Sequence, residues 1–281
     1  MTISLATRDD LPDALALLYD VAPEDRPAYL AHAYRLMARG DLDPADFWLA
    51  RDDSGRLAGV MALRELPGAA GVVWPPRTDP PGREGVEDDL MRAALAHLTR
   101  ATVLQTFLPP AQRDLAAPLL RHGFAHITDV LHMEHPGGVH AVAGELELAD
   151  ADADSPAFER LLTRCHEDSA DCPELNHGRT AADLIAGYRD TAPEPHGWCV
   201  AVRRGHPVGI AIAGMEDLAF LGLVPEARGQ GLGVGFLNLV LDRMAGPCRL
   251  TVDERNIPAR RLYERAGFVD TDTRQVYLWF A

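Results

Sequence analysis

The stretch Arg228-Gly229-Gln230-Gly231-Leu232-Gly233 decides the fold of this chain. It follows an apolar run at residues 218–224 and precedes an amphipathic run at residues 236–244, so the pattern predicts a strand that enters a helix through a glycine-rich turn. Glycines let the backbone come close to a ligand, because no Cβ stands in the way. The first N–H groups of a helix lie at the positive end of its dipole, which favours anions. The turn therefore predicts a site for a phosphate or pyrophosphate group.

Two common phosphate-binding motifs do not match this turn. A P-loop requires Lys followed by Ser or Thr after its last glycine, whereas Val234 and Gly235 follow Gly233 and the chain contains no Lys. In the dinucleotide motif G-x-G-x-x-G, the third glycine is replaced by Val234 in one alignment and by Phe236 in the other. What remains is the pattern R-x-x-G-x-G, which begins at Arg228.

A second informative segment covers residues 256–268. Asn256 is a favoured N-cap and Gly267 is the usual residue just after a helix, so we expect a helix from about Ile257 to Ala266. Seven residues separate Asn256 from Tyr263, which is nearly two turns of ~3.6 residues, so both side chains project from the same side. Taken alone, the segment is explained equally well by a capping role for Asn256 and a packing role for Tyr263.

Together, the two segments resemble the GNAT superfamily of acyl-CoA-dependent N-acyltransferases. The superfamily's acyl-CoA motif, Q/R-x-x-G-x-G/A, is matched by Arg228, Gly231 and Gly233. Its second motif, N-x-x-A-x-x-L-Y-x-x-x-G-F, is matched by Asn256, Ala259, Leu262, Tyr263, Gly267 and Phe268. The resemblance implies an α/β (α+β) fold, in which a mixed, mostly antiparallel twisted sheet is flanked by helices.

The resemblance also implies a role for each part in binding acetyl-CoA, the expected acyl-CoA cosubstrate. The backbone N–H groups of Gly229 to Val234 would hold the pyrophosphate, and Tyr263 would protonate the departing thiolate as general acid. Asn256 would contact the pantetheine arm or an ordered water near the thioester. In the superfamily the fourth and fifth strands splay apart around a bulge, for which Gly222 is well placed, and pantetheine pairs with the open edge. The expected cofactor-binding residues are Leu221, Gly222, Leu223, Arg228, Gly229, Gln230, Gly231, Leu232, Gly233, Val234 and Asn256.

A proton acceptor for the amine is also expected, because an amine is protonated at neutral pH. In the superfamily a carboxylate at the head of the fourth strand often has this role, and Glu216 and Asp217 occupy that place. Asp253 and Glu254, after the fifth strand, are alternatives. All four can equally be solvated charges at strand ends, and an amine that binds in its neutral form needs no base.

The chain contains an internal repeat. An offset of 144 residues aligns Gly123 with Gly267 and places Leu119, which has no proton to donate, where the second copy has Tyr263. The expected strands of the first copy lie at residues 47–51, 57–63 and 71–74.

The first copy lacks the phosphate-binding pattern. Residues 74–85, where its turn is expected, do not contain R-x-x-G-x-G, and their prolines have no N–H to donate. The sequence therefore predicts a degenerate GNAT-like domain at residues 1–138, which supports the active half and closes its acceptor site. A linker at 136–139 leads to a catalytic GNAT domain at residues 144–281.

The loop after the first helix of the second copy is the expected acceptor region. A polar acceptor pocket formed by Asp168, Asp171, Glu174 and Asn176 is one interpretation, and an ordinary capped loop is the other. Residues 166–179 also contain two His and a Cys, but their spacing matches no standard metal site, so no metal is expected.

Composition limits the classes of partner. The net charge of −15 argues against a nucleic-acid surface, which needs clustered cations. An acidic field can draw in amines or can simply keep the protein in solution. No apolar run approaches the ~20 residues of a transmembrane helix, the N-terminus lacks the features of a signal peptide, and the four Cys are scattered. A cytoplasmic protein without a membrane partner is therefore expected.

The sequence predicts an acetyl-CoA-dependent N-acetyltransferase that transfers an acyl group directly to a primary amine of a small molecule, within a ternary complex. The architecture is similar to that of mycothiol synthase, a tandem GNAT protein that pairs a degenerate first domain with an active second one. Acetylation of a protein or peptide is one alternative, and a non-catalytic acyl-CoA-binding regulatory module is another. An intact Tyr263 favours catalysis, and the oligomeric state is not specified by the sequence.

Overall fold

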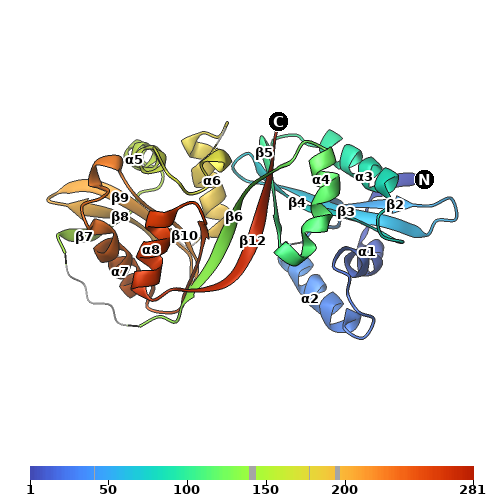
Figure 1. Ribbon diagram of the computed structural model, residues 1–281, viewed down its shortest axis with the longest axis horizontal. Coiled ribbons are helices and arrows are strands. Elements are labelled where there is room, and N and C mark those ends of the chain that lie inside the picture. Colours follow the sequence, from blue (N-terminus) through green and yellow to red (C-terminus); the bar gives the residue numbers. More distant parts are fainter. Residues whose placement is uncertain (41, 139–143, 177, 194–196) are drawn as a thin grey trace. The chain divides into compact units, whose positions relative to one another are not determined.

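The computed structural model describes residues 1–40, 42–138, 144–176, 178–193 and 197–281 (Figure 1). The chain forms two compact units. Unit 1 comprises Met1–Leu66, Ala70–His126 and Tyr277–Ala281, and unit 2 comprises Pro67–Ala69 and Ile127–Val276. Each unit therefore takes a short segment from the other half of the chain, and the division at residues 138 and 144 stays a prediction about the repeat. Val139 of the expected linker lies outside the described residues.

Unit 1 is built on a mixed sheet. Its elements are β1 (Thr2–Leu5), α1 (Leu11–Leu18), α2 (Arg26–Arg39), β2 (Phe47–Arg51), β3 (Leu57–Leu66), β4 (Ala70–Thr78), α3 (Glu84–Ala96), β5 (Val103–Leu108) and α4 (Ala116–Arg121). Strands β1 to β4 pair in chain order, all antiparallel, and β5 runs parallel to β4. The amphipathic helices bury apolar side chains against the sheet, such as Leu11 and Leu15 of α1 and Leu90 and Met91 of α3.

Unit 2 carries the strand pairs that matter for the site. Its elements are β6 (Ala125–His135, from Ile127 onward), β7 (Leu146–Asp150), α5 (Pro156–His166), α6 (Ala181–Thr191), β8 (Trp198–Arg203), β9 (His206–Ala213), β10 (Leu218–Leu223), α7 (Leu232–Met244), β11 (Cys248–Asp253), α8 (Ile257–Ala266) and β12 (Val269–Phe280, to Val276). Strands β10, β9, β8 and β7 form an antiparallel sheet in that order, and β11 pairs antiparallel with β6. Strand β10 is therefore an edge of the four-stranded sheet.

The same order of elements occurs twice along the chain, as the internal repeat predicts. The series β-α-α-β-β-β-α-β-α-β runs from β1 to β6 and again from β7 to β12. Both copies combine helices with strand pairs that are mostly antiparallel. The predicted mixed α/β fold class is confirmed.

Two predicted strands of the first copy were too short, because β3 continues past residue 63 to Leu66 and β4 continues past residue 74. Strand β4 does not end at Trp74 but continues through Pro75 and Pro76 to Thr78. The register between β3 and β4 shifts at this point, between Val60 and Ala62. Proline cannot donate to a ladder and is tolerated at such irregularities, so the two prolines bend the pairing without ending the strand.

Helix α8 has the bounds that its sequence signals predict. The Asn256 side chain accepts a hydrogen bond from the N–H of Ala259 at 3.3 Å, and Pro258 lies in the first turn. Gly267 ends the helix in the left-handed conformation, at a φ of 100°. The cap at Asn256 and the stop at Gly267 act on neighbouring backbone groups only, which is why the sequence alone locates this helix.

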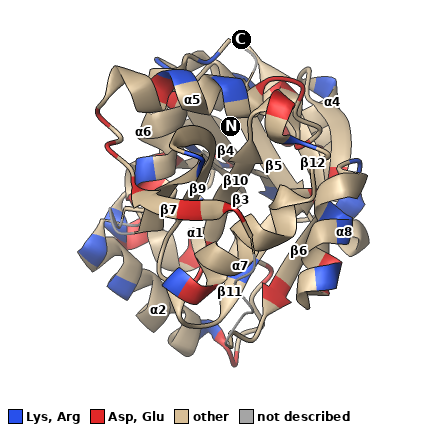
Figure 2. Cartoon of the chain, turned by 90° about the vertical axis from the view of Figure 1, so that its left-hand side faces the viewer, with Lys and Arg blue, Asp and Glu red and all other residues tan. Residues whose placement is uncertain are grey.

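The charges of unit 2 are mixed in sign. Figure 2 shows ribbon segments of Arg (blue) and of Asp or Glu (red) interspersed on the elements that face the viewer, among them α5, β7, α7 and α8. Several of them form ion pairs, including Arg203 with Glu145 at 2.9 Å. Within the described part of the chain, no helix combines the length and apolar character needed to cross a membrane.

Candidate active site

A cavity of about 540 Å³ in unit 2 brings most of the predicted site residues together. Four segments line it, namely the end of α5 with the loop after it, the end of β10, the glycine turn with the start of α7, and one side of α8. The predicted residues in its lining are Leu221, Gly222, Leu223, Arg228, Gly229, Gly231, Leu232, Gly233, Val234, Asn256 and Tyr263. Gln230, Glu216 and Asp217 are not part of this lining.

Strands β10 and β11 diverge beside this cavity. They meet at a single parallel bridge between Asp217 and Arg249, where the N–H of Arg249 donates to the carbonyl of Glu216 at 2.7 Å. Beyond the bridge β10 pairs with β9 and β11 pairs with β6, so within the described residues the two strands form no ladder with each other. The divergence expected from the resemblance is present, and it leaves one edge of β10 open toward a ligand.

The expected bulge at Gly222 was wrong. The register shift of β10 lies between Leu218 and Phe220, and Gly222 pairs regularly with Ile210 of β9. Glycine is needed at 222 for space, because a Cβ there would lie 2.6 Å from the ring of Phe220 and 3.1 Å from the Cβ of Cys165. Close packing of Phe220 over the strand, rather than a bulge, explains this glycine.

The glycine turn presents free backbone donors to the cavity. Gly229 and Gly231 have φ values of 71° and 77°, which a residue with a Cβ adopts only with strain. Among the described residues, no protein acceptor takes a hydrogen bond from the N–H groups of residues 229–234. A run of unpaired N–H groups at the start of α7 is what an anion requires.

In the corresponding turn of the first copy, several backbone donors already bind protein acceptors. Between β4 and α3, the N–H of Arg83 donates to the Thr78 hydroxyl at 3.2 Å, and the N–H of Glu84 donates to the carbonyl of Gly82 at 3.1 Å. The first turn of α3 carries Glu84 and Glu87, whose charges oppose an anion at a helix N-terminus. These contacts favour the interpretation of the first copy as degenerate, which stays a prediction.

Arg228 has its side chain committed to protein carbonyls. Its guanidinium donates to Leu223 at 2.9 Å, to Cys165 at 3.0 Å and to Asp168 at 3.3 Å. Hydrogen bonds from a charged donor each contribute about 1.5–3 kcal/mol, so Arg228 ties the end of β10 to the end of α5. Its predicted role in cofactor binding is therefore best understood as positioning the turn. The Gln230 side chain likewise contacts protein, accepting from Arg203 at 2.6 Å.

Tyr263 contributes a protonated phenol to the wall of the cavity. The residue is 8% exposed, and its ring lies 5.6 Å from that of Phe268. Burial, and then the negative charge of Asp171, raise the pKa of its hydroxyl above the ordinary value, so the group carries a proton at neutral pH. Among the described residues the hydroxyl has no hydrogen-bond partner. A phenol in this state can donate to a ligand in the cavity.

The carboxylates predicted as bases lie outside the cavity lining. Glu216 and Asp217 are about half exposed and pair with Arg249 at 3.3 and 3.1 Å. Asp253 is 1% exposed and accepts from the Thr128 hydroxyl at 2.7 Å and the Cys172 N–H at 3.0 Å. Burial opposes its charge, but hydrogen bonds from Arg255 and Thr128 outweigh this and lower its pKa. Asp253 is thus a structural anchor.

Only two of the four residues expected in the acceptor pocket line the cavity. Asp168 and Asp171 line the cavity, whereas Glu174 pairs with Arg255 at 2.8 Å and Asn176 contacts the His166 ring at 3.2 Å. The sequence does not show which of these four side chains face the cavity, because that depends on the path of the loop in three dimensions.

His166 is a packing residue beside the cavity. Its ring stacks on Phe220 at 4.6 Å, and burial, followed by the charges of Arg179 and Arg228, lowers its pKa to about 4. His166 is therefore neutral at physiological pH. His177 lies outside the described residues. Within the described parts of the chain, no group of three or more His, Cys, Asp or Glu is arranged to hold a metal ion.

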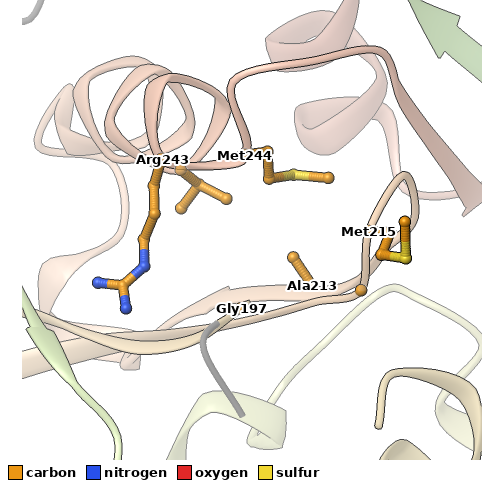
Figure 3. Close-up of a pocket in the computed structure, with 7 residues that line it drawn as sticks. Gly197, Ala213, Met215, Arg243 and Met244 are labelled. Atoms are coloured by element: carbon orange, nitrogen blue, oxygen red, sulfur yellow. The ribbon is translucent and has the colours of Figure 1, made fainter. Parts of the chain in front are cut away.

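A second pocket of about 450 Å³ lies between the end of β9 and the end of α7 (Figure 3). Figure 3 shows the Arg243 guanidinium on one side of it and the thioethers of Met215 and Met244 on the other. None of the predicted site residues lines this pocket. Within the part of the chain that the structure describes, its lining has no carboxylate, hydroxyl or imidazole, and so no group there that could move a proton at neutral pH.

Comparison with known proteins identifies the class of protein that this site defines. Residues 159–268 match the model of the acetyltransferase (GNAT) family. These residues form a GNAT acetyltransferase domain, which makes the chain an acyltransferase.

One curated relative and two solved structures extend the likeness over nearly the whole chain. The chain is 26% identical to a mycothiol acetyltransferase from Streptomyces bingchenggensis (strain BCW-1), over 94% of this chain and 91% of the relative. A GCN5-related N-acetyltransferase from Sphaerobacter thermophilus superposes with a TM-score of 0.58 at 16% identity, covering 99% of this chain and 95% of that one. A tandem GNAT protein from the clavulanic acid biosynthesis pathway superposes with a TM-score of 0.53 at 19% identity, covering 99% and 98%. Both structures share the fold.

Proposed function

We propose that the chain transfers an acetyl group from acetyl-CoA directly to a primary amine of a small molecule, in a ternary complex. One observation carries the proposal. A single cavity combines the unpaired N–H groups of the glycine turn, the open edge of β10 and the protonated hydroxyl of Tyr263. These are an anion site, a slot for an amide-like arm and a proton donor, which together suit an acyl-CoA thioester.

The residues of the cavity fit CoA in charge and space. The pyrophosphate would bind at the N–H groups of Gly229 to Val234, where no Cβ of Gly231 fills the space. The pantetheine arm would lie along Leu221 to Leu223, and Asn256 would contact it from the start of α8. CoA supplies the activated acyl group, and the chain supplies its orientation and its protons.

Tyr263 would act as general acid. When the C–S bond of a thioester breaks, sulfur leaves as a thiolate, and a nearby proton lowers the barrier to its departure. The raised pKa keeps the phenol protonated at neutral pH. A purely regulatory CoA-binding module has no need of this group, which favours an enzyme.

The chemistry of the relative favours a small acceptor. The mycothiol acetyltransferase match spans 91% of that protein, so it involves both halves of this chain. Acetylation of proteins or peptides is the second candidate within the same family. The four Cys are free thiols, which fits a reducing compartment, and we propose the cytoplasm.

The proposed function is tested by incubating the chain with acetyl-CoA and a panel of small primary amines, α-amino peptides and lysine peptides. We expect release of free thiol above the acceptor-free rate with at least one small amine, together with formation of its acetamide by mass spectrometry. Turnover with peptides alone would support the second candidate. Tight CoA binding without turnover on any acceptor would instead support a binding module.

Titration of CoA is expected to reveal one site per chain. The glycine turn of the second copy has free N–H donors, whereas the turn of the first copy uses several of its donors internally and carries acidic residues. Isothermal titration calorimetry measures the stoichiometry directly. Two equivalents of CoA per chain would contradict the degenerate assignment of residues 1–138.

A further inference from the structure

The proposed function gives one wall of the cavity no role in holding acetyl-CoA. This wall is formed by Cys165 and residues 168–171, and it contributes the carboxylates of Asp168 and Asp171 to the lining. The other three walls carry the glycine turn, the open edge of β10 and the side of α8 with Tyr263. An acceptor must reach the thioester from a wall that CoA does not occupy, and this one is acidic, which suits a cationic amine.

Asp171 is held firmly at this wall. Its Oδ1 accepts a hydrogen bond from the N–H of Asp253 at 3.0 Å. The side chain of Asn256 also donates to it, and the oxygen of Asn256 is occupied by the N–H of Ala259 at 3.3 Å, which orients the amide. Although protein surrounds Asp171, the residue stays exposed to the cavity. A carboxylate held in this way loses little conformational entropy when it binds a ligand.

The surroundings of Asp171 make it a better proton acceptor than an ordinary aspartate. Burial raises its pKa, and the negative charge of Asp253 adds to this, while hydrogen bonds and the charge of Arg255 only partly compensate. Asp171 and Tyr263 both line the cavity, and the negative charge of Asp171 contributes to the raised pKa of Tyr263. One cavity therefore contains a proton acceptor, the Asp171 carboxylate, and a proton donor, the Tyr263 phenol, which suits a reaction that removes one proton and delivers another.

We propose that Asp171 binds the ammonium group of the acceptor and accepts its proton. The proposal rests on the proposed function and assigns the base of that reaction to the loop after α5. The rival carboxylates are placed less well, because Asp253 is buried in a network with Arg255 and Thr128, and Glu216 and Asp217 pair with Arg249 outside the lining.

The proton and electron balance of the step is complete without a further reactant. The acceptor arrives as an ammonium ion, and one proton moves from its nitrogen to the Asp171 carboxylate. The freed lone pair attacks the thioester carbonyl carbon, so a C–N bond forms, the C–S bond breaks, and its electron pair stays on sulfur. The thiolate takes the proton of Tyr263, and the nitrogen returns a second proton to the phenolate through solvent. The products are the amide, the CoA thiol and a protonated Asp171, which releases its proton to solvent.

The experiment compares two acceptors that differ in basicity. The first is the primary amine that supports the fastest wild-type turnover, and the second is a fluorinated analogue of it whose nitrogen is already neutral at neutral pH. Asp171→Asn is expected to lower kcat/KM for the basic amine by about 100-fold or more. For the neutral analogue, which has no proton to lose before attack, the loss should be less than about tenfold. The Kd for CoA should not change.

Glu167→Gln is the matched control, because it removes one negative charge from the same segment at an exposed position outside the lining. It should change neither acceptor's kcat/KM by more than about twofold. Equal losses with both amines in Asp171→Asn would mean a structural role and would overturn the proposal. So would a wild-type rate in that variant, or a loss confined to Glu216→Gln or Asp217→Asn. Absence of turnover by the wild-type chain with every amine would reject the proposed function itself, and the role of Asp171 with it.

Discussion

Replacing Tyr263 with Phe is expected to lower kcat by a factor of about 100 to 10,000, the usual range for loss of a general acid or base. The phenol lines the cavity, its raised pKa keeps it protonated at neutral pH, and its hydroxyl makes no hydrogen bond to protein among the described residues. The phenylalanine ring keeps the packing against Phe268. Steady-state kinetics with saturating acetyl-CoA measures the effect, and the Kd for CoA should stay within about twofold, because no binding group is removed.

Stability separates a chemical effect from a folding defect in this variant. The Tyr263 hydroxyl makes no protein hydrogen bond among the described residues, so its removal should change the free energy of unfolding by less than about 1 kcal/mol. Tyr188→Phe is the control for kcat, since Tyr188 is a half-buried tyrosine of unit 2 whose pKa is also raised, but it lies outside the cavity lining. Its hydroxyl contacts Nε2 of His166 at 3.4 Å, so the stability of this variant is not compared. An unchanged kcat in Tyr263→Phe would show that another group protonates the thiolate.

Replacing Gly231 with Val is expected to weaken CoA binding by at least about tenfold, because the new side chain occupies the space in front of the free N–H groups and strains the turn that presents them. Gly231 has a φ of 77° at the N-cap of α7, and an added Cβ meets no protein atom within 4 Å. Strain of a β-branched residue at positive φ costs about 1–2 kcal/mol of stability. Calorimetric titration with CoA and thermal unfolding measure the two effects separately.

Gly55→Val is the matched control, because it imposes the same backbone strain at a position outside the cavity lining. Gly55 has a φ of 83° and also has no atom within 4 Å of an added Cβ, but it lies in the turn between β2 and β3. Both variants should lose a similar amount of stability, and only Gly231→Val should lose CoA affinity. If the two bind CoA equally well, the glycine turn is not the pyrophosphate site.

Several features of this chain follow from interactions between neighbours in the sequence. The bounds of α8 were predicted from Asn256 and Gly267, since a cap and a left-handed stop act within one turn of helix. The strand–turn–helix at the glycine stretch was predicted from the switch in apolar spacing and from the glycines that the turn requires. The fold class was predicted as well, because both copies of the repeat show strand and helix patterns in the same order.

Other features depend on partners far away in the chain. Strand β6 belongs to the first copy of the repeat, yet it pairs with β11 in unit 2, because an apolar strand pattern does not encode the identity of the neighbouring strand. Part of the space requirement at Gly222 arises from Cys165 of helix α5, which is 57 residues away. The bulge was predicted from the glycine alone, whereas the structure shows that close packing is the reason for a glycine at this position.

The sequence by itself determined that a glycine turn leads into a helix, that a capped helix presents Asn256 and Tyr263 on one side, and that the turn of the first copy lacks these features. Only the tertiary structure decided which carboxylate faces the cavity. Asp171 and Asp253 are 82 residues apart, and one hydrogen bond between them brings the loop after α5 to the end of β11. Local signals carry no information about such contacts, because burial and electrostatic surroundings exist only after the loop has packed against the strands.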